Sequence, residues 1–440
     1  MTTPVYCETV ELAHEASSVA RALGLAVDAE HAPDPLVRAA RAAAEGVLAA
    51  AICIELPAPE ALIDALHTCS ERGRVVLGAI AQRDRQGFGL AADLGFVCVR
   101  DVAPVLSAIA IVETGIDRPW RANARKLSSS DQVRLARALG QSERGAARLA
   151  TDPDGAMITL ARGEQTPPAR IGGGLAVAEA LAALAAAEPC ADARRTLATP
   201  PDRAATRDVL YGPPRLLSDP ASKAALLPFG LPMPQEELCS SPSRAASEAG
   251  RIGFPVRISL ASPDLRVWDH PELSVDGVDN AARVRDVYRQ LLAAAQELAP
   301  EARVLGVTVT ATTLARALTR VSARPAPHGR VLLRVGFSDP HGATAKDAIS
   351  TVLPAAPASV ERALTRLEAE LLVLGQTSAE RAKNLTLLSE LFARVAAFID
   401  ANRNEVARLE LHPVALLVDG GAEIREAAVE VTDAFLRELD

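Results

Sequence analysis

Two polar residues near the C-terminus have a spacing that could bind a cation. Glu410 and His412 lie two positions apart in the short apolar segment Glu410-Leu-His-Pro-Val414. Alternate side chains of a β-strand share one face, so this carboxylate and this imidazole would point the same way. Together they could hold a metal ion. A structural role is equally open, with Glu410 paired to an arginine and His412 capping a turn before Pro413.

The stretch 217–258 predicts a helix, a strand, a second helix and a second strand. Its first helix begins at Ser218-Asp-Pro220 and ends at Gly230, because serine and aspartate cap helix starts and glycine ends helices. The second helix ends at Gly253. A short apolar strand follows, and it carries a single cation, Arg257.

This stretch resembles the start of the ATP-grasp domain of the NDP-forming acyl-CoA synthetases, relatives of acetate-CoA ligase and of the succinyl-CoA synthetase beta subunit. The residues that carry the resemblance are Lys223, Leu226-Leu227, Gly230-Leu-Pro-Met-Pro234, Ile252-Gly-Phe-Pro-Val-Arg-Ile258 and Ser262-Pro-Asp264. Further on, 329–337 and 410–414 resemble two more motifs of the family. The resemblance covers roughly residues 206–440.

The resemblance implies an ATP-grasp-like α+β domain of two subdomains that grip a nucleotide, with ATP and Mg²⁺ as cofactors. It implies that Lys223 and Arg257 contact the nucleotide, although Arg257 stands where the family has a lysine. The implied metal ligands are Glu410, His412, Glu426 and Asp347. His412 replaces a family asparagine, and magnesium prefers oxygen ligands. No catalytic residue is predicted.

Other family features are missing from the sequence. A His-Lys pair and a glycine-rich closing loop are replaced by the segment 262–273, in which Asp269 and Glu272 would repel a triphosphate. We therefore expect a solvated surface loop there. Residues 313–322 read as a helix or a long irregular connection, where the family has a glutamate-containing strand.

The N-terminal part alternates helices with short, continuously apolar strands, such as 47–55 and 74–81. Such runs are typical of a parallel sheet covered on both faces. We predict a flavodoxin-like or Rossmann-like three-layer domain over residues 1–115, a poorly defined connecting region over 116–205 and the ATP-grasp-like domain over 206–440. No G-x-G-x-x-G follows a strand, so the dinucleotide-binding fingerprint is absent.

Composition excludes several classes of protein. The formal net charge is -8 over 440 residues, which argues against nucleic-acid binding because no basic excess exists to displace counterions. The six cysteines are scattered without a C-x-x-C pair, which is typical of reduced thiols in a cytosolic protein. Neither a secretory signal nor an apolar run of about 18 residues is found, so we expect a soluble, cytoplasmic protein.

The sequence thus predicts a divergent ATP-grasp acyl-CoA synthetase-like protein that is catalytically impaired and acts as a binding, scaffold or regulatory subunit. Binding of CoA would then need a partner chain, so a partner protein or a homo-oligomer is expected. One alternative is an active ATP-dependent, ADP-forming acid-CoA ligase in which Arg257 contacts phosphate. Another is a protein-interaction module that uses the N-terminal α/β domain alone.

Overall fold

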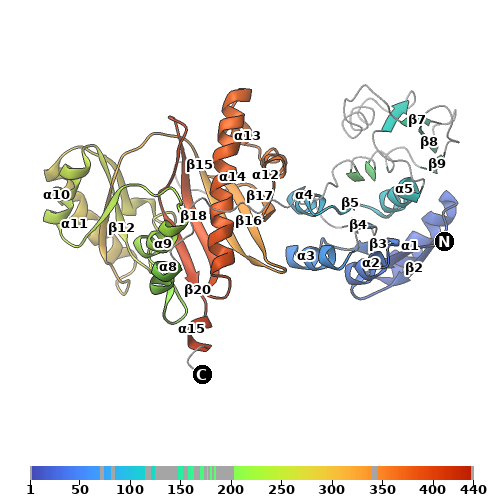
Figure 1. The fold of residues 1–440 in the computed structure, drawn as a ribbon, viewed down its shortest axis with the longest axis horizontal. Coiled ribbons are helices and arrows are strands. Elements are labelled where there is room, and N and C mark those ends of the chain that lie inside the picture. Colours follow the sequence, from blue (N-terminus) through green and yellow to red (C-terminus); the bar gives the residue numbers. More distant parts are fainter. Residues whose placement is uncertain are drawn as a thin grey trace. The chain divides into compact units, whose positions relative to one another are not determined.

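The chain divides into two compact units, Met1–Cys190 and Ala191–Asp440, which are described separately (Figure 1). The computed structural model describes residues 2–69, 74–80, 85–113, 120–123, 147–151, 157–162, 169–172, 203–338 and 344–437, with isolated positions between 176 and 184. No helix among these residues is long and apolar enough to cross a lipid bilayer.

The first unit is built on a five-stranded parallel sheet in the order β2-β1-β3-β4-β5. The strands are β1 (Thr3–Cys7), β2 (Val27–His31), β3 (Leu48–Cys53), β4 (Arg74–Ala79) and β5 (Val97–Val99). This is the strand order of flavodoxin-type doubly wound sheets. The predicted parallel sheet is confirmed. Strands β3 and β4 are buried almost throughout, which explains their continuous apolar sequences.

Helices surround this sheet. They are α1 (Val10–Leu23), α2 (Pro35–Ala44), α3 (Pro59–Thr68), α4 (Arg85–Asp93) and α5 (Val102–Glu113). Helices α1 and α5 contact each other and share a core with Val5, Ala50 and Ile52, while α2 contacts α3. A second, four-stranded sheet lies within the region predicted as a poorly defined connection. It consists of β6 (Trp120–Asn123), β7 (Ala147–Thr151), β8 (Met157–Arg162) and β9 (Ala169–Gly172).

The second unit contains a large antiparallel sheet in the order β10-β20-β18-β15-β16-β17, with β19 paired to β18. Its strands are β10 (Arg215–Leu216), β15 (Ala315–Ala326), β16 (Arg330–Ser338), β17 (Thr344–Leu353), β18 (Val406–Leu417), β19 (Ala422–Ile424) and β20 (Ala427–Val431). Strand β15 shows that the helix or irregular connection predicted for 313–322 is wrong. Its Ala, Leu and Arg residues favour helix locally, but hydrogen bonds to β16 and β18 on both sides override that preference.

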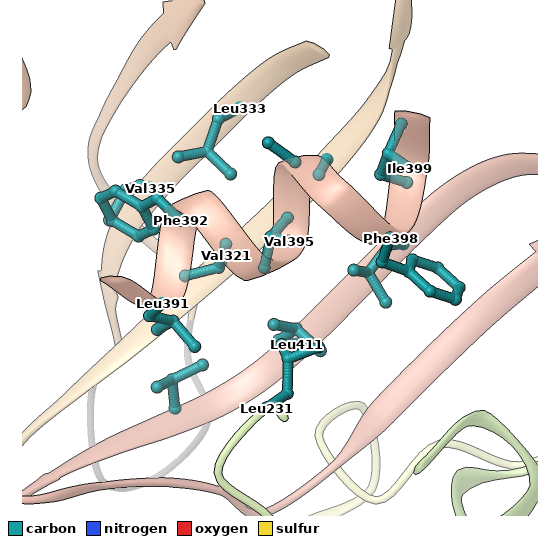
Figure 2. Close-up of a cluster of buried hydrophobic side chains, with 14 of the residues drawn as sticks. Leu231, Val321, Leu333, Val335, Leu391, Phe392, Val395, Phe398, Ile399 and Leu411 are labelled. Atoms are coloured by element: carbon teal, nitrogen blue, oxygen red, sulfur yellow. The ribbon is translucent and has the colours of Figure 1, made fainter. Parts of the chain in front are cut away.

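One face of the large sheet is buried by a long helix, α14 (Ser378–Ala401). Figure 2 shows Phe392 and Val395 of this helix packed over Val321, Leu333 and Leu411 of the sheet. The helix begins with a capping box between Thr377 and Glu380. Helix α14 therefore fixes which face of each strand is apolar.

Residues 357–374 form two helices, α12 (Pro357–Leu364) and α13 (Glu370–Leu374), with a break between them. The break has an identifiable cause. The carboxylate of Asp347, on β17, accepts hydrogen bonds from the backbone N–H groups of Glu368 and Ala369, each at 2.9 Å. These bonds fix the two residues that immediately precede α13, so the chain cannot continue α12 as one helix.

A smaller antiparallel sheet, in the order β11-β14-β12-β13, forms the other half of this unit. Its strands are β11 (Glu236–Cys239), β12 (Val256–Ala261), β13 (Ser274–Val278) and β14 (Gly306–Ala311). Helices α10 (Pro242–Ile252) and α11 (Ala281–Leu298) share its core. The chain enters this unit through α8 (Arg203–Leu210) and α9 (Asp219–Leu226). The two sheets, each with its own helices, confirm the predicted α+β arrangement of two subdomains.

A substitution at Gly306 can test the pairing of β14 with β11. Its φ is 136°, and a Cβ at this position would lie 2.2 Å from the backbone oxygen of Cys239. We expect Gly306→Ala to lower the free energy of unfolding of this unit by about 1–3 kcal/mol. The change in unfolding free energy is measured by a denaturant titration monitored through Trp268 fluorescence. A Trp120→Phe background leaves Trp268 as the one tryptophan of the sequence.

The matched control is Gly250→Ala, inside α10, where an added Cβ meets no atom within 4 Å. This change should stabilise the unit by about 0.5–1 kcal/mol, because alanine loses less conformational entropy than glycine in a helix. Equal stability of the two variants would contradict the described approach of β14 to β11.

Candidate functional site

The core of each sheet decides which polar side chains face the other sheet. On β12, Val256, Ile258 and Leu260 belong to the core shared with α10 and α11, so Arg257 lies on the opposite face. The large sheet follows the same rule. Leu409 and Leu411 of β18 face the core with α14, so Glu410 and His412 between and beyond them face away from it.

Arg257 and Glu426 join the two sheets through a hydrogen bond. The Nη2 atom of Arg257 lies 3.0 Å from Oε1 of Glu426, and both side chains are mostly buried. The Nε–H of Arg257 is directed at the hydroxyls of Ser259 and Ser274, at 3.1 and 3.0 Å. The cation predicted to contact a nucleotide is therefore directed at a carboxylate predicted to bind a metal.

Burial changes the protonation of Glu426. Removal of this carboxyl from water raises its pKa to about 8, although Arg257 and Lys223 act to lower it. At neutral pH the protonated form is therefore favoured. A protonated carboxyl carries no charge for a divalent cation.

Lys223 has no N–H left for a ligand. Its Nζ atom donates to Asp219 Oδ2 at 2.9 Å, to the backbone oxygen of Arg425 at 2.8 Å and to Glu236 Oε2. An ammonium group has three N–H donors, so all are used inside the protein. Burial lowers the pKa of Lys223, but Asp219 and Glu236 raise it by more, so the side chain stays charged. Lys223 ties α9 to the segment that precedes β20.

Glu410 is neutralised by arginines on both sides. Its Oε2 atom accepts hydrogen bonds from Nη2 and Nε of Arg320, at 2.8 and 3.1 Å, and its Oε1 atom contacts Arg408. Charge-assisted hydrogen bonds are stronger than those between neutral groups. A metal ion at Glu410 would have to compete with two guanidinium groups.

His412 is a buried, neutral imidazole. Its Nε2 atom lies 2.9 Å from Oγ of Ser338, and no described residue hydrogen-bonds its Nδ1 atom. Burial, together with Arg320, lowers the pKa of His412 to about 4. Its ring centroid lies 5.6 Å from that of Trp268.

The segment 262–273 that carries Trp268 is only partly the solvated loop predicted from the sequence. Asp269 and Glu272 are exposed, as expected, but Leu265, Val267 and Leu273 are buried in the core of the small sheet. The expectation was wrong for these apolar residues because Leu265 and Val267 form too short an alternation, and Leu273 lies too far along the chain, for periodicity to mark them as buried.

Asp347 does not lie with the other predicted metal ligands. Its neighbour Ala348 lines a cavity on the polar face of the large sheet, so the Asp347 side chain points to the opposite face, where its oxygens accept the two backbone bonds described above. Glu410, His412 and Glu426 do share the polar face. The backbone N–H of His412 donates to the backbone oxygen of Glu426 at 3.0 Å, which places these two residues opposite each other.

Three arginines on this face were not predicted from the sequence: Arg320, Arg334 and Arg408. With Ser322, Ser338 and His412 they line a cavity of about 260 Å³. Arg320 and Ser322 alternate with buried Val321 and Ala323. This period of two was the available signal, and it was hidden because 313–322 was interpreted as a helix.

The residues present do not fit a magnesium nucleotide. The spaces beside Arg257 and beside Glu426 hold only about 10 Å³ each, which is room for roughly one water molecule. Among the described residues, no group of three or more His, Cys, Asp or Glu side chains is arranged to hold a metal ion. Each of the acidic candidates already has an internal partner, and His412 offers nitrogen to a metal that prefers oxygen.

The lowered pKa of His412 predicts how stability depends on pH. Between about pH 6.5 and pH 4 the unfolded chain binds a proton at this position that the folded chain does not, so acidification costs up to about 3 kcal/mol. His412→Asn should remove this loss, and its stability relative to wild type should therefore increase as pH falls. Denaturant titrations of both proteins at pH 7, 5.5 and 4, monitored through Trp268 fluorescence, test this pH dependence. A constant difference would show that His412 is not buried neutral.

The raised pKa of Glu426 predicts a trend with the opposite sign. The folded chain holds a proton here that the unfolded chain releases from about pH 4.5, so this contribution to stability is lost as pH rises to about 8. Glu426→Gln should gain stability relative to wild type over that range, by up to roughly 5 kcal/mol. Glu430→Gln, at an exposed position of β20, controls for the loss of a negative charge. A gain for both variants alike would contradict the burial argument.

Comparisons with known proteins agree with this architecture. The ATP-grasp domain family matches residues 209–431. The chain is 22% identical over 208 residues to the ADP-forming 4-hydroxybutyrate-CoA ligase of Nitrosopumilus maritimus, which covers 47% of this chain and 29% of that protein. It is 20% identical over 209 residues to subunit beta of the ADP-forming acetate-CoA ligase II of Pyrococcus furiosus, which covers 47% of this chain and 88% of that subunit.

Among solved structures, the dinucleotide-forming acetyl-coenzyme A synthetase 1 of Ca. Korarchaeum cryptofilum is similar, with 19% identity and a TM-score of 0.44 over 49% of this chain and 93% of that one. The chain spans less than a third of the Nitrosopumilus ligase. The family match covers half of the 440 residues and includes both sheets of the second unit. The chain therefore belongs to the ATP-grasp family, as a divergent, acyl-CoA ligase-like member.

Proposed function

We propose that this protein is a catalytically impaired ATP-grasp protein that acts as a binding, scaffold or regulatory subunit. The observation that carries the proposal is the buried hydrogen bond between Arg257 and Glu426. One contact occupies both the cation that would meet phosphate and a carboxyl group that would meet magnesium. Leaving a hydrogen bond to a charged group unmade typically costs about 1.5–3 kcal/mol, so a nucleotide would have to repay that cost before it bound.

The other candidate groups support the same proposal. Lys223 directs all three of its N–H groups to protein oxygens, and Glu410 is bound by Arg320 and Arg408. These contacts neutralise each charged group where a ligand would need it. The fold of the family is kept while the groups that would handle a magnesium nucleotide are engaged elsewhere.

A partner chain is part of this proposal. One relative of this protein is by its name the beta subunit of a ligase. We propose that this chain likewise works with a partner protein or a second copy, and that its functional division follows residues 1–115, 116–205 and 206–440. The five-stranded parallel sheet would then belong to the first part and both antiparallel sheets to the last.

An active ADP-forming acid-CoA ligase is the second candidate. Arg257, Glu410, His412 and Glu426 do lie on the polar faces of the two sheets, and both named relatives are ADP-forming CoA ligases. In that case the nucleotide would take the place of the internal contact between Arg257 and Glu426.

A thermal-shift titration distinguishes the two candidates. The purified chain is titrated with ATP, ADP or CoA, each with and without magnesium. A ligand present at 100 times its dissociation constant adds about 2.7 kcal/mol to the stability of the state that it binds. We expect no magnesium-dependent shift with millimolar nucleotide.

The variants Glu410→Ala and Glu430→Ala make the result specific. An increase of several degrees with magnesium nucleotide, lost in Glu410→Ala but kept in Glu430→Ala, would favour the ligase and overturn the impaired-enzyme proposal. Glu430 is a suitable control because it lies on β20 of the same sheet but is exposed.

A further inference from the structure

Three guanidinium groups converge on one cavity of the large sheet. Arg320 of β15, Arg334 of β16 and Arg408 of β18 line it, together with Ser322, Ser338 and His412. We call this space the arginine cavity. It lies on the face of the sheet opposite α14, because the residues that alternate with these positions belong to the α14 core.

The strand register separates Arg334 from the carboxylate that neutralises its neighbours. Ser322 lies opposite Glu410 on one side and opposite Arg334 on the other. Adjacent strands are about 4.8 Å apart, so Arg334 and Glu410 stand two strands apart. Arg334 is exposed, and no described residue forms a hydrogen bond or ion pair with it. Its five N–H donors are available.

The arginine cavity keeps a surplus of positive charge. Three arginines line the cavity and no described carboxylate does; Glu410 contacts two of them from beside it, and Glu430 stands opposite Arg408 in the strand register, which leaves a surplus of one formal positive charge. His412 adds none, because it is neutral at pH 7. The protein as a whole has a net charge of -8, so the charge of this region is opposite in sign to that of the whole protein. Like charges held close together repel, and a bound anion relieves that repulsion.

The other lining groups suit an oxyanion. The hydroxyls of Ser322 and Ser338 can donate hydrogen bonds, and planar guanidinium groups match phosphate and carboxylate oxygens in bidentate geometry. The volume is about 260 Å³, just below the range of about 300–1,000 Å³ typical of drug-sized ligands. A compact ligand is therefore favoured over a whole nucleotide.

We propose that the arginine cavity binds a compact dianionic oxyanion, either a phosphate-type group or a small dicarboxylate, without a divalent metal. This inference deepens the binding role proposed above and rests on it. Arg334 provides the free donors, Arg320 and Arg408 are shared with Glu410, and the serine hydroxyls complete the contacts.

Isothermal titration calorimetry on the full chain tests the proposal. Sodium phosphate, pyrophosphate and succinate are titrated separately in buffer with EDTA at constant ionic strength, and sodium chloride serves as the ionic control. We expect saturable binding of at least one dianion and none of chloride. Binding of phosphate and pyrophosphate alone would identify a phosphate-type ligand, and binding of succinate alone would identify a dicarboxylate.

Two variants give opposite expected effects. Arg334→Gln should weaken binding about tenfold or more, because one charge-assisted contact is lost, and its exposed position leaves the fold intact. Glu410→Gln should strengthen binding, because it releases Arg320 and Arg408. Arg289→Gln, at an exposed position of α11, removes an arginine outside the cavity and should leave binding unchanged.

Several results would overturn the proposal. The first is that no dianion binds saturably at millimolar concentration. The second is that Arg334→Gln and Arg289→Gln weaken binding equally, and the third is that Arg334→Gln has no effect on binding. With no magnesium-nucleotide shift, each of these leaves the impaired-enzyme proposal in place. Anion binding that requires magnesium and disappears in Glu410→Gln would overturn both proposals, because Glu410 would then act as a metal ligand.

Discussion

Burial of one face of the large sheet under α14 is the constraint on which the rest of the second unit depends. Side chains of a strand alternate between faces, so a chain that packs Val321 and Leu411 against α14 must present Arg320 and Glu410 on the other side. A slip of one residue would exchange the two sets. The polar chemistry of this face is thus fixed by the apolar packing behind it.

Several polar groups on the facing sides of the two sheets have partners within the protein. Arg257 donates to Glu426 across the sheets and Lys223 pairs with Asp219, while burial favours the neutral forms of Glu426 and His412. Burial raises the pKa of Glu426 and lowers that of His412, since a low dielectric disfavours either charge. A ligand that enters between Arg257 and Glu426 must therefore replace an existing contact.

The arginine cavity departs from this pattern. Arg257 has Glu426 and Lys223 has Asp219 within contact distance, but in the arginine cavity Glu410 serves two arginines and Arg334 lies two strands away. The departure follows from register, because the β15 residue between Glu410 and Arg334 is a serine with no charge to offer. Local charge imbalance in an otherwise balanced network is what distinguishes this cavity from the filled spaces beside Arg257.

The sequence by itself determined the features that depend on neighbouring residues. Continuous apolar runs predicted the parallel sheet, caps and glycines predicted α9 and α10, and a spacing of two placed Glu410 and His412 on one face. Only the tertiary structure decided that 315–326 is a strand, because its hydrogen-bond partners lie in β16 and β18. Only the tertiary structure paired Arg257 with Glu426, which are 169 positions apart. Propensity and periodicity extend over a few residues, whereas the partner of a buried charge depends on how distant strands are brought into register.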